Sequence, residues 1–452
     1  MVRRLPAIGL LLVVAAAIAA RRPDVFTQPQ FWAEDGMEWY ARAYNEPGVL
    51  NLVAPYGGYM QLFPRLAGLL ALAVPFTAAP LLMAVLTIAV QSIAPVFLLS
   101  DRFAWTVPHR GVRLVLALLV VAAPNLMEVH ANATNGQVHL AFLALLILLA
   151  EPRDGRGWRA FDAGFLLLSG FSGPFCLLLL PVAALAWWHW RDRWSLVRLG
   201  CVFVPALVQG VLLSPLAPPP TAPTSRGIVI RTPLSPFGAT PGSLLRIYGG
   251  QIVVGTLGGW HVYAGLHAGA FAAHPWLPAL LGLAGIAFVA RAAWVTDSTA
   301  LRLLLLYATL HMAAGLASPI IIGPRPLWEM LSDPGAGQRY WYTMIVAFLA
   351  TLVWTAAADP RRGMRVLGAV LLAVTALSGI RGDWRLPPRE DLDFAAQAAR
   401  LASSPPGKIV RIAIPPAPNE MLLIRGCEEP RVAVVNPERA RRLRSRRACP
   451  DR

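Results

Sequence analysis

Long runs of apolar residues, separated by short polar connections, fill the chain as far as Ile380. A helix that crosses a bilayer needs about 20 mostly apolar residues. The runs lie near 5–20, 66–78, 79–100, 112–126, 137–150, 161–172, 174–190, 196–215, 246–259, 276–290, 303–322, 341–357 and 366–380. Several of them are too short to span alone, so we expect about ten to twelve crossings. The pattern predicts an all-α polytopic membrane protein.

The first run, 5–20, lies between two Arg pairs and ends in small residues at 17–20. A short apolar segment with a small-residue end is typical of a cleavable signal peptide. Many further apolar runs follow it, so we favour an uncleaved first transmembrane helix.

Basic residues mark the cytoplasmic loops of membrane proteins. They cluster at 3–4, 102–113, 153–159, 191–198, 291–302 and 361–365. The Arg-poorer connections, which we place outside, are 23–64, 127–136, 216–245, 260–275 and 323–340. This assignment requires an odd number of crossings within 65–101, which reads as two short helices. Either 66–78 is a re-entrant or interfacial segment, or the 102–113 loop breaks the rule.

Composition excludes a soluble or disordered protein, because 56% of the residues are hydrophobic and only 14% are charged. Soluble domains carry roughly 25% charged residues. The 40 basic and 24 acidic residues give a net charge of +16. Because these charges lie in short clusters between apolar runs, they indicate membrane orientation and not a nucleic-acid partner.

The composition changes after residue 380, which predicts a transmembrane domain at 1–380 and a small extracytoplasmic tail at 381–452. The tail contains one strand-like run, 408–414, and its last stretch, 438–452, holds seven Arg. We interpret that stretch as a solvated segment that contacts anionic lipid head groups. In an oxidising compartment Cys427 and Cys449 could form a disulfide.

The first outside loop contains the sequence Phe-Trp-Ala-Glu-Asp-Gly-Met-Glu-Trp-Tyr, with carboxylates at positions 34, 35 and 38. Glu38 can pair with Arg42 one helical turn later, whereas Glu34 and Asp35 have no obvious local partner. Desolvation at the edge of a bilayer raises a carboxyl pKa, which suits a general base. The alternative is that this acidic pair satisfies free N–H groups at a helix start.

A Gly turn with two Tyr residues follows, and Arg65 stands at the entrance to the next apolar run. An Arg in this position can bind a phosphate bidentately. It can equally extend its charge to the membrane surface as an ordinary anchor.

The order of these elements resembles bacterial membrane glycosyltransferases of the GT-C superfamily. A short first helix precedes the loop with Phe-Trp-Ala-Glu-Asp-Gly, and a Gly-Tyr…Pro-Arg-Leu segment enters the second helix. Segments 132–140, 168–175 and 337–340 resemble the family's Asn…Asn-x-Gln-x-His-Leu, Ser-Gly-Pro-Phe and Gly-x-Arg-Tyr elements. The likeness runs through most of the chain, although no single motif is highly specific.

The resemblance implies a GT-C-like helix bundle in a bacterial plasma membrane, with an active site facing outside the cytoplasm. It implies transfer of a sugar from a polyprenyl-phosphate carrier to an envelope glycan or lipid, with inversion. The family's catalytic acidic residue in the first outside loop, expected to act as the general base, falls on Asp35, with Glu34 as the close alternative. Some members of the family hold a divalent metal and others need none; with no clear second cluster of outside carboxylates, we favour independence from a metal and expect no other cofactor.

Further polar residues are candidates for substrate contacts. Arg65 and Arg339 are candidate ligands of the donor phosphate, since Arg339 stands at a predicted helix start. Candidates for substrate binding are Tyr59, His130, Asn135, His139 and Tyr340. Histidines at helix ends are more often structural.

Two further functions, and the role of one loop, stay open. The chain could be a flippase or transporter of lipid-linked sugars, or an envelope glycan polymerase or acyltransferase. A transporter should carry charge at the bilayer midplane, whereas the predicted helices are almost uncharged there. The Pro-rich loop 216–245 could be a lid that orders over a donor, or a linker.

Overall fold

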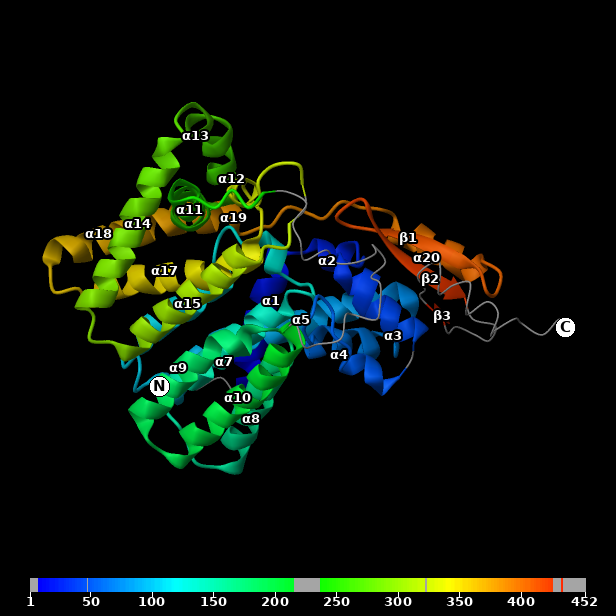
Figure 1. Ribbon diagram of the computed structural model, residues 1–452, viewed down its shortest axis with the longest axis horizontal. Coiled ribbons are helices and arrows are strands. Elements are labelled where there is room, and N and C mark those ends of the chain that lie inside the picture. Colours follow the sequence, from blue (N-terminus) through cyan, green and yellow to red (C-terminus); the bar gives the residue numbers. More distant parts are fainter. Residues whose placement is uncertain (1–6, 47, 215–235, 322, 426–431, 434–452) are drawn as a thin grey trace.

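The computed structural model describes residues 7–46, 48–214, 236–321, 323–425 and 432–433, and helices dominate it (Figure 1). The predicted apolar runs fall largely within helices, except for 66–78, of which only 66–71 belong to an α-helix. The longer helices are α1 (Ala7–Arg21), α4 (Leu62–Ala71), α5 (Ala79–Leu98), α6 (Arg110–Ala122), α7 (Gly136–Leu149), α8 (Arg156–Gly170), α9 (Phe175–Trp190), α10 (Arg193–Leu213), α12 (Gly255–Ala268), α14 (Trp276–Val295), α15 (Thr299–Ala317), α17 (Gln338–Ala358), α18 (Arg362–Val374) and α20 (Phe394–Ser403).

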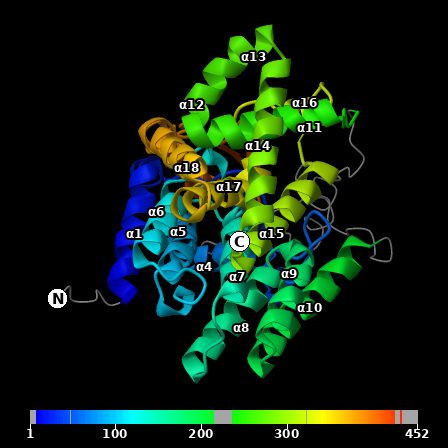
Figure 2. The ribbon, with the colours of Figure 1, turned by 90° about the vertical axis from the view of Figure 1, so that its left-hand side faces the viewer.

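Shorter elements connect them. They are α2 (Asp24–Thr27), α3 (Ala41–Asn45), α11 (Pro241–Ile247), α13 (Ala270–Ala273), α16 (Leu327–Leu331), α19 (Arg381–Asp383), the 3-10 turns η2 (Val49–Leu52), η3 (Phe76–Ala78), η4 (Asp101–Phe103) and η5 (Met127–Val129), and the π-helical segments η1 (Asp35–Tyr40), η6 (Tyr248–Val254) and η7 (Thr375–Ile380). Figure 2 shows α12, α13 and α14 projecting together from the bundle.

Helices of membrane-spanning length and a broad apolar surface indicate a membrane protein. In the described residues, six helical stretches are long and apolar enough to cross a bilayer: Phe76–Leu98, Arg193–Leu213, Trp276–Val295, Thr299–Ala317, Gln338–Ala358 and Arg362–Asp383. Large apolar side chains cover their outer faces, for example Phe203 on α10 and Val370 on α18. A soluble protein rarely exposes so much contiguous apolar surface. The number of crossings stays a prediction.

The centre of the bundle is α7, whose 14 residues are all buried. It packs against α5, α8, α9, α15 and α17. A helix that is apolar on every side must be enclosed by other elements, and the sequence of α7 has this character from Leu140 onwards.

Segment 65–101 forms one short helix and one long one. The ten residues of α4 extend about 15 Å at 1.5 Å per residue, against a hydrocarbon core of about 30 Å. By contrast, η3 and α5 together form a spanning stretch of 23 residues. The geometry therefore fits the alternative in which the first segment is interfacial and only α5 crosses.

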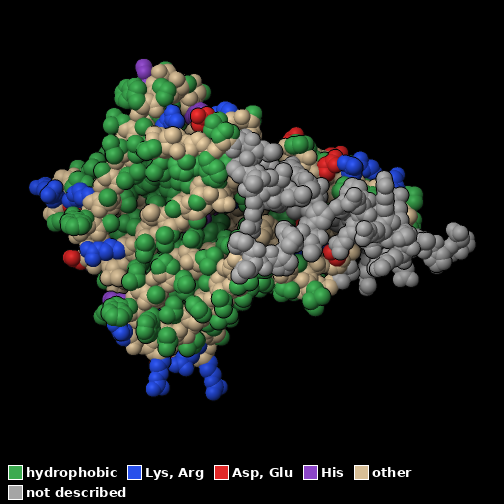
Figure 3. All heavy atoms as spheres, viewed as in Figure 1, with side chains coloured by type: hydrophobic (Ala, Val, Ile, Leu, Met, Phe, Trp, Pro, Cys, Tyr) green, Lys and Arg blue, Asp and Glu red, His purple; other side chains and the backbone are tan. Residues whose placement is uncertain are grey.

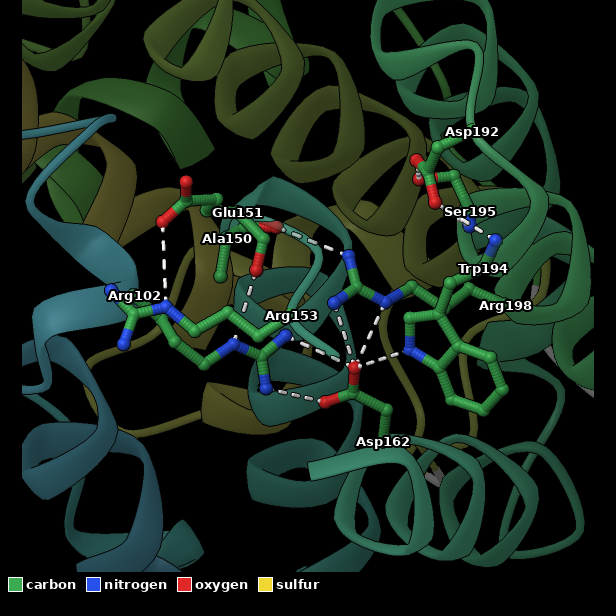
Figure 4. A network of polar contacts seen from close by, with 9 residues as sticks. All are labelled: Arg102, Ala150, Glu151, Arg153, Asp162, Asp192, Trp194, Ser195 and Arg198. Carbon is green, nitrogen blue, oxygen red and sulfur yellow. Dashed lines mark hydrogen bonds and ion pairs between the residues drawn. The ribbon is translucent and has the colours of Figure 1, made fainter. Parts of the chain in front are cut away.

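The predicted cytoplasmic loops meet in two groups at the ends of helices. In one, Arg102 of η4 and Arg198 of α10 share the buried carboxylate of Asp162 on α8, so this group joins η4 to the N-terminal halves of α8 and α10 (Figure 4). In the other, Arg291 forms an ion pair with Asp359, with Nη2 3.0 Å from Oδ1. Figure 3 shows Lys and Arg side chains at the left and lower ends of the bundle, and others at the upper right, over the C-terminal region of Figure 1.

The C-terminal region contains a small antiparallel sheet in the order β1-β2-β3 (Ile409–Ile414, Asn419–Arg425, Val432–Ala433). The strand predicted at 408–414 is confirmed as β1. Buried residues of β1 and β2, such as Ile412 and Met421, share one hydrophobic core with Phe31 and Tyr40 of the first loop. Residues 394–425 are therefore docked on the first loop and are not a freely solvated tail.

Three predictions fall on residues outside the described ranges. They concern Cys427 and Cys449, the Arg-rich stretch 438–452, and residues 216–235 of the Pro-rich loop. The rest of that loop leads into α11, where the Thr240 side chain caps the helix by accepting a hydrogen bond from the N–H of Ser243 at 3.0 Å.

Candidate functional site

The acidic pair stands at the start of η1, against the turn that precedes α7. Asp35 is 4% exposed. One carboxylate oxygen accepts a hydrogen bond from the N–H of Ala133 at 2.9 Å. The other accepts from the N–H and the hydroxyl of Thr134, both at 2.8 Å. Asp35 thus fixes the first loop to a turn almost one hundred residues later, and its N–H partners belong to that turn and not to its own helix.

Burial raises the pKa of the Asp35 carboxyl to about 6. The hydrogen bonds from Ala133 and Thr134 oppose this shift because they favour the charged form, and Arg389 does the same. The effect of desolvation is larger. Asp35 therefore changes its charge close to neutral pH, which is the range in which a carboxyl group works as a base.

Glu34 occupies the position before Asp35 and is only half-buried. It interacts electrostatically with Tyr59 and with Arg339. Burial raises the pKa of Tyr59 to about 12, so this phenol stays protonated and can donate a hydrogen bond at neutral pH. Of the two acidic residues, Glu34 is the more exposed.

Arg339 stands in the first turn of α17 and is held from three sides. It forms an ion pair with Glu128 and donates a hydrogen bond to the carbonyl of Ile320 at 2.7 Å. Its guanidinium also lies 4.8 Å from the centre of the Tyr340 ring. The Tyr340 hydroxyl accepts a hydrogen bond from the N–H of Ile320 at 2.7 Å.

We name the group Glu34, Tyr59, Glu128, Arg339 and Tyr340 the rim cluster. It joins η1, the loop before α4, the loop before α7 and the start of α17, four segments that are far apart in the sequence. The structure thus brings together four of the sequence-predicted site residues and adds Glu128 to them.

Arg65 lies in a different place, on the buried face of α4. It is 3% exposed, forms an ion pair with Glu38 at 3.1 Å, and its guanidinium is 5.2 Å from the Trp39 ring. The predicted pair of Glu38 with Arg42 is confirmed at 2.7 Å. Because two Arg residues share Glu38, the charge of Arg65 already has a fixed partner, and its role as a phosphate ligand stays a prediction.

Asn135 supports the turn that Asp35 binds. Its side chain donates to the carbonyl of Glu128 at 3.2 Å and to Oδ1 of Asn132 at 3.0 Å. These contacts hold the turn in shape.

The two histidines are buried, and the hydrogen-bond partners of their rings are not members of the rim cluster. Nε2 of His130 is 3.1 Å from a guanidinium nitrogen of Arg21. Because guanidinium only donates, Nε2 accepts and the ring is neutral with its proton on Nδ1. Burial, reinforced by the charge of Arg21, holds the pKa of His130 well below its usual value. His139 contacts the carbonyl of Val129 at 2.9 Å, so both rings stabilise the bundle interior.

Arg389 is a site residue that the sequence reasoning missed. Its guanidinium donates to the carbonyls of His130 and Ala131, both at 3.2 Å, and lies 4.7 Å from the centre of the Trp32 ring. It also interacts electrostatically with Asp35. Burial lowers the pKa of Arg389 to about 9. Arg389 comes from the C-terminal region, and no local pattern connects it with the first loop.

Two other partners were also missed. Glu128 could have been found as an acidic residue in the outside connection 127–136, whereas Thr134 is an ordinary member of the polar segment 132–140.

Within the described ranges, no three His, Cys, Asp or Glu side chains lie together in a way that could hold a metal ion. Independence from metals stays a prediction, because several ranges of the chain are not described.

No protein-family model, curated protein or solved structure matches this chain.

Proposed function

We propose that the chain is a membrane-embedded glycosyltransferase that uses a polyprenyl-phosphate-linked sugar. The acceptor would be a hydroxyl group of a cell-envelope glycan or lipid. The reaction would take place at the rim cluster, on the side of the membrane away from the basic loops. The alternatives of a lipid-linked-sugar transporter and an envelope polymerase or acyltransferase are distinguished by the experiment below.

The reaction assigned to this site is a single displacement. The acceptor oxygen attacks C1 of the sugar, and its proton passes to a carboxylate of the acidic pair. The bond between C1 and the phosphate oxygen breaks, and polyprenyl phosphate leaves with the electron pair. One displacement inverts the configuration at C1.

Within the acidic pair, we assign the proton transfer to Glu34 because it is the more exposed of the two residues. A general base must come within about 3 Å of the proton that it removes. Glu34 is half-buried beside Tyr59 and Arg339. Asp35, with both oxygens engaged by Ala133 and Thr134, would position η1.

The cation of the rim cluster is Arg339. A donor phosphate and Glu128 would both bind the guanidinium of Arg339. The start of α17 adds the positive end of a helix dipole. The proposed phenol donor is Tyr59, which keeps its proton at neutral pH.

One observation carries the proposal. An accessible carboxylate, a protonated phenol and a guanidinium at a helix start interact at one end of an apolar helix bundle. This combination suits transfer between a lipid-linked phosphate ester and a hydroxyl group. The likeness to GT-C motifs names the reaction class but is supported by sequence motifs alone.

The test is transfer of a radiolabelled sugar in proteoliposomes. The donors would be a panel of polyprenyl-phosphate hexoses and pentoses, and the acceptor a lipid and glycan extract of bacterial envelopes. Glu34→Gln should lower kcat by about 10²- to 10⁴-fold, the usual contribution of a general base, with KM little changed. Glu46→Gln, on the same loop and half-buried, serves as the matched control and should keep full activity.

The outcomes separate the alternatives. Full activity in both Glu34→Gln and Asp35→Asn would refute the role of the acidic pair. If Asp35→Asn alone abolishes transfer and leaves the fold intact, the base is Asp35. Movement of the donor across the bilayer without transfer of its sugar to any acceptor would identify a transporter.

A further inference from the structure

The turn η2, in the first loop, exposes large aliphatic side chains. Val49 is 77% exposed, Leu50 is 79% exposed and Val53 is 52% exposed. A loop surrounded by water is normally built from polar and turn-forming residues. Three exposed aliphatic residues within five positions therefore indicate contact with something apolar.

Helix α4 continues this surface. Leu69 and Leu70 are 37% and 51% exposed, whereas Phe63 and Ala67 of the same helix are buried. One face of α4 thus packs on the protein and the other carries aliphatic side chains outwards. The close packing is fixed at Gly68, where an added Cβ would lie 2.4 Å from the carbonyl oxygen of Trp39. Helix α4 therefore cannot rotate to bury its leucines.

The exposed aliphatic surface joins that of the spanning helices. The turn η2 packs on α4, and α4 packs on α5. On α5, Val85 in the second turn is 43% exposed. Since the spanning stretch that contains α5 begins at residue 76, Leu69 and Leu70 lie close to the end of that span. Three elements that pack on one another in succession, η2, α4 and α5, thus each expose aliphatic side chains.

The charged residues next to this surface compensate one another. Arg65 is paired with Glu38 at 3.1 Å, and Arg42 contacts Glu38 at 2.7 Å and Glu46 at 3.8 Å. Two cations thus face two carboxylates. This compensation lowers the cost of placing the neighbouring surface against hydrocarbon, since an isolated charge there is expensive.

We propose that Val49, Leu50, Val53, Leu69 and Leu70, here named the aliphatic patch, are embedded in the acyl chains of the outer leaflet. The occupant of this surface is the lipid bilayer itself. Interfacial elements of this kind bury their apolar face about 5 to 10 Å deep. The first loop would then be attached to the membrane both through the end of α1 and through the patch. This inference does not depend on the reaction assigned to the rim cluster.

Spin-label accessibility tests the proposal. The four cysteines are replaced, a nitroxide is attached at Leu50→Cys, and the full chain is reconstituted in phosphatidylcholine vesicles. Power saturation compares collisions with oxygen, which concentrates in hydrocarbon, and with a water-soluble nickel chelate. Leu207→Cys on α10 provides the lipid reference, and Ser403→Cys at the end of α20 provides the water reference.

The label at Leu50 should show an oxygen-to-nickel ratio close to that at Leu207 and several-fold above that at Ser403. A label at Leu70→Cys should agree. A ratio equal to that at Ser403 would overturn the proposal, because the patch would then face water. Low collision rates with both reagents would also overturn it, because the patch would then be covered by protein. Each labelled variant should elute at the same volume as the unlabelled chain, which establishes that the variant is folded.

Discussion

Asp162 is the most heavily bonded carboxylate in the described part of the chain, and its removal should destabilise the protein strongly. Asp162 is fully buried and accepts hydrogen bonds from five N–H groups. Four belong to the guanidinium groups of Arg102 and Arg198, at 2.6 to 3.0 Å, and one belongs to the indole of Trp194, at 3.0 Å (Figure 4). Asp162→Asn leaves two buried cations without a counter-charge.

The expected loss follows from this arrangement. Removing one partner of a buried ion pair costs about 3 to 5 kcal/mol. The entropy of unfolding is about 2.1 cal/mol/K per residue, which gives about 1 kcal/mol/K for the 452 residues. The unfolding temperature should therefore fall by about 3 to 5 °C. The assay is the fraction of protein that remains monodisperse in size-exclusion chromatography after heating in detergent.

Two further variants make this result decisive. Asp154, 93% exposed and paired with Arg159, is the matched control, and Asp154→Asn should change stability by less than about 1 kcal/mol. Adding Arg198→Met to Asp162→Asn should recover part of the loss, because one uncompensated cation is removed. Equal unfolding temperatures for Asp162→Asn and the unmutated chain would refute the reasoning, as would a double variant less stable than Asp162→Asn.

Three other predictions concern the first loop. The folded-state pKa of Asp35, about 6, lies above the usual 3.8, so its ionised form lowers stability above pH 6. This penalty disappears as the pH falls towards 4, and the unfolding temperature of the unmutated chain should rise relative to Asp35→Asn over that range; a constant difference would contradict the assignment. Arg389→Met should move the effect to higher pH, because a cation that favours ionised Asp35 is lost. Gly68→Ala should destabilise the chain through the clash with Trp39, whereas Gly164→Ala, in an open position on α8, should stabilise it by about 0.5 to 1 kcal/mol; similar thermal shifts for the two would refute the close packing of α4.

The helices could be predicted from the sequence because a bilayer imposes a local requirement. Every apolar run must satisfy its backbone hydrogen bonds internally, and a helix is the local structure that does so. Strand β1 and the pair of Glu38 with Arg42 were also visible, since the first is a short run of strand-forming residues and the second joins residues four positions apart. The apolar run at 66–78 did not reveal that α4 is short.

The site depended on contacts that no local pattern contains. The carboxylate of Asp35 is held by Ala133 and Thr134, and Arg389 comes from the other end of the chain. The sequence reasoning singled out Glu34 and Asp35 because the sequence showed no obvious local partner for either. It could not separate their roles, because the turn before α7 buries Asp35 and leaves Glu34 more exposed.

The shared core of the first loop and the C-terminal sheet has a consequence for biogenesis. Trp39 and Met421 belong to the same hydrophobic core, yet 382 residues (421 minus 39) separate them in the chain. At a synthesis rate of about 5 to 20 residues per second, the loop waits roughly 20 to 80 seconds for its partner strands. During that time Phe31 and Tyr40 lack the apolar cover that β1 and β2 provide. A ribosome that stops before residue 409 would release an inserted helix bundle whose first loop cannot complete its hydrophobic core.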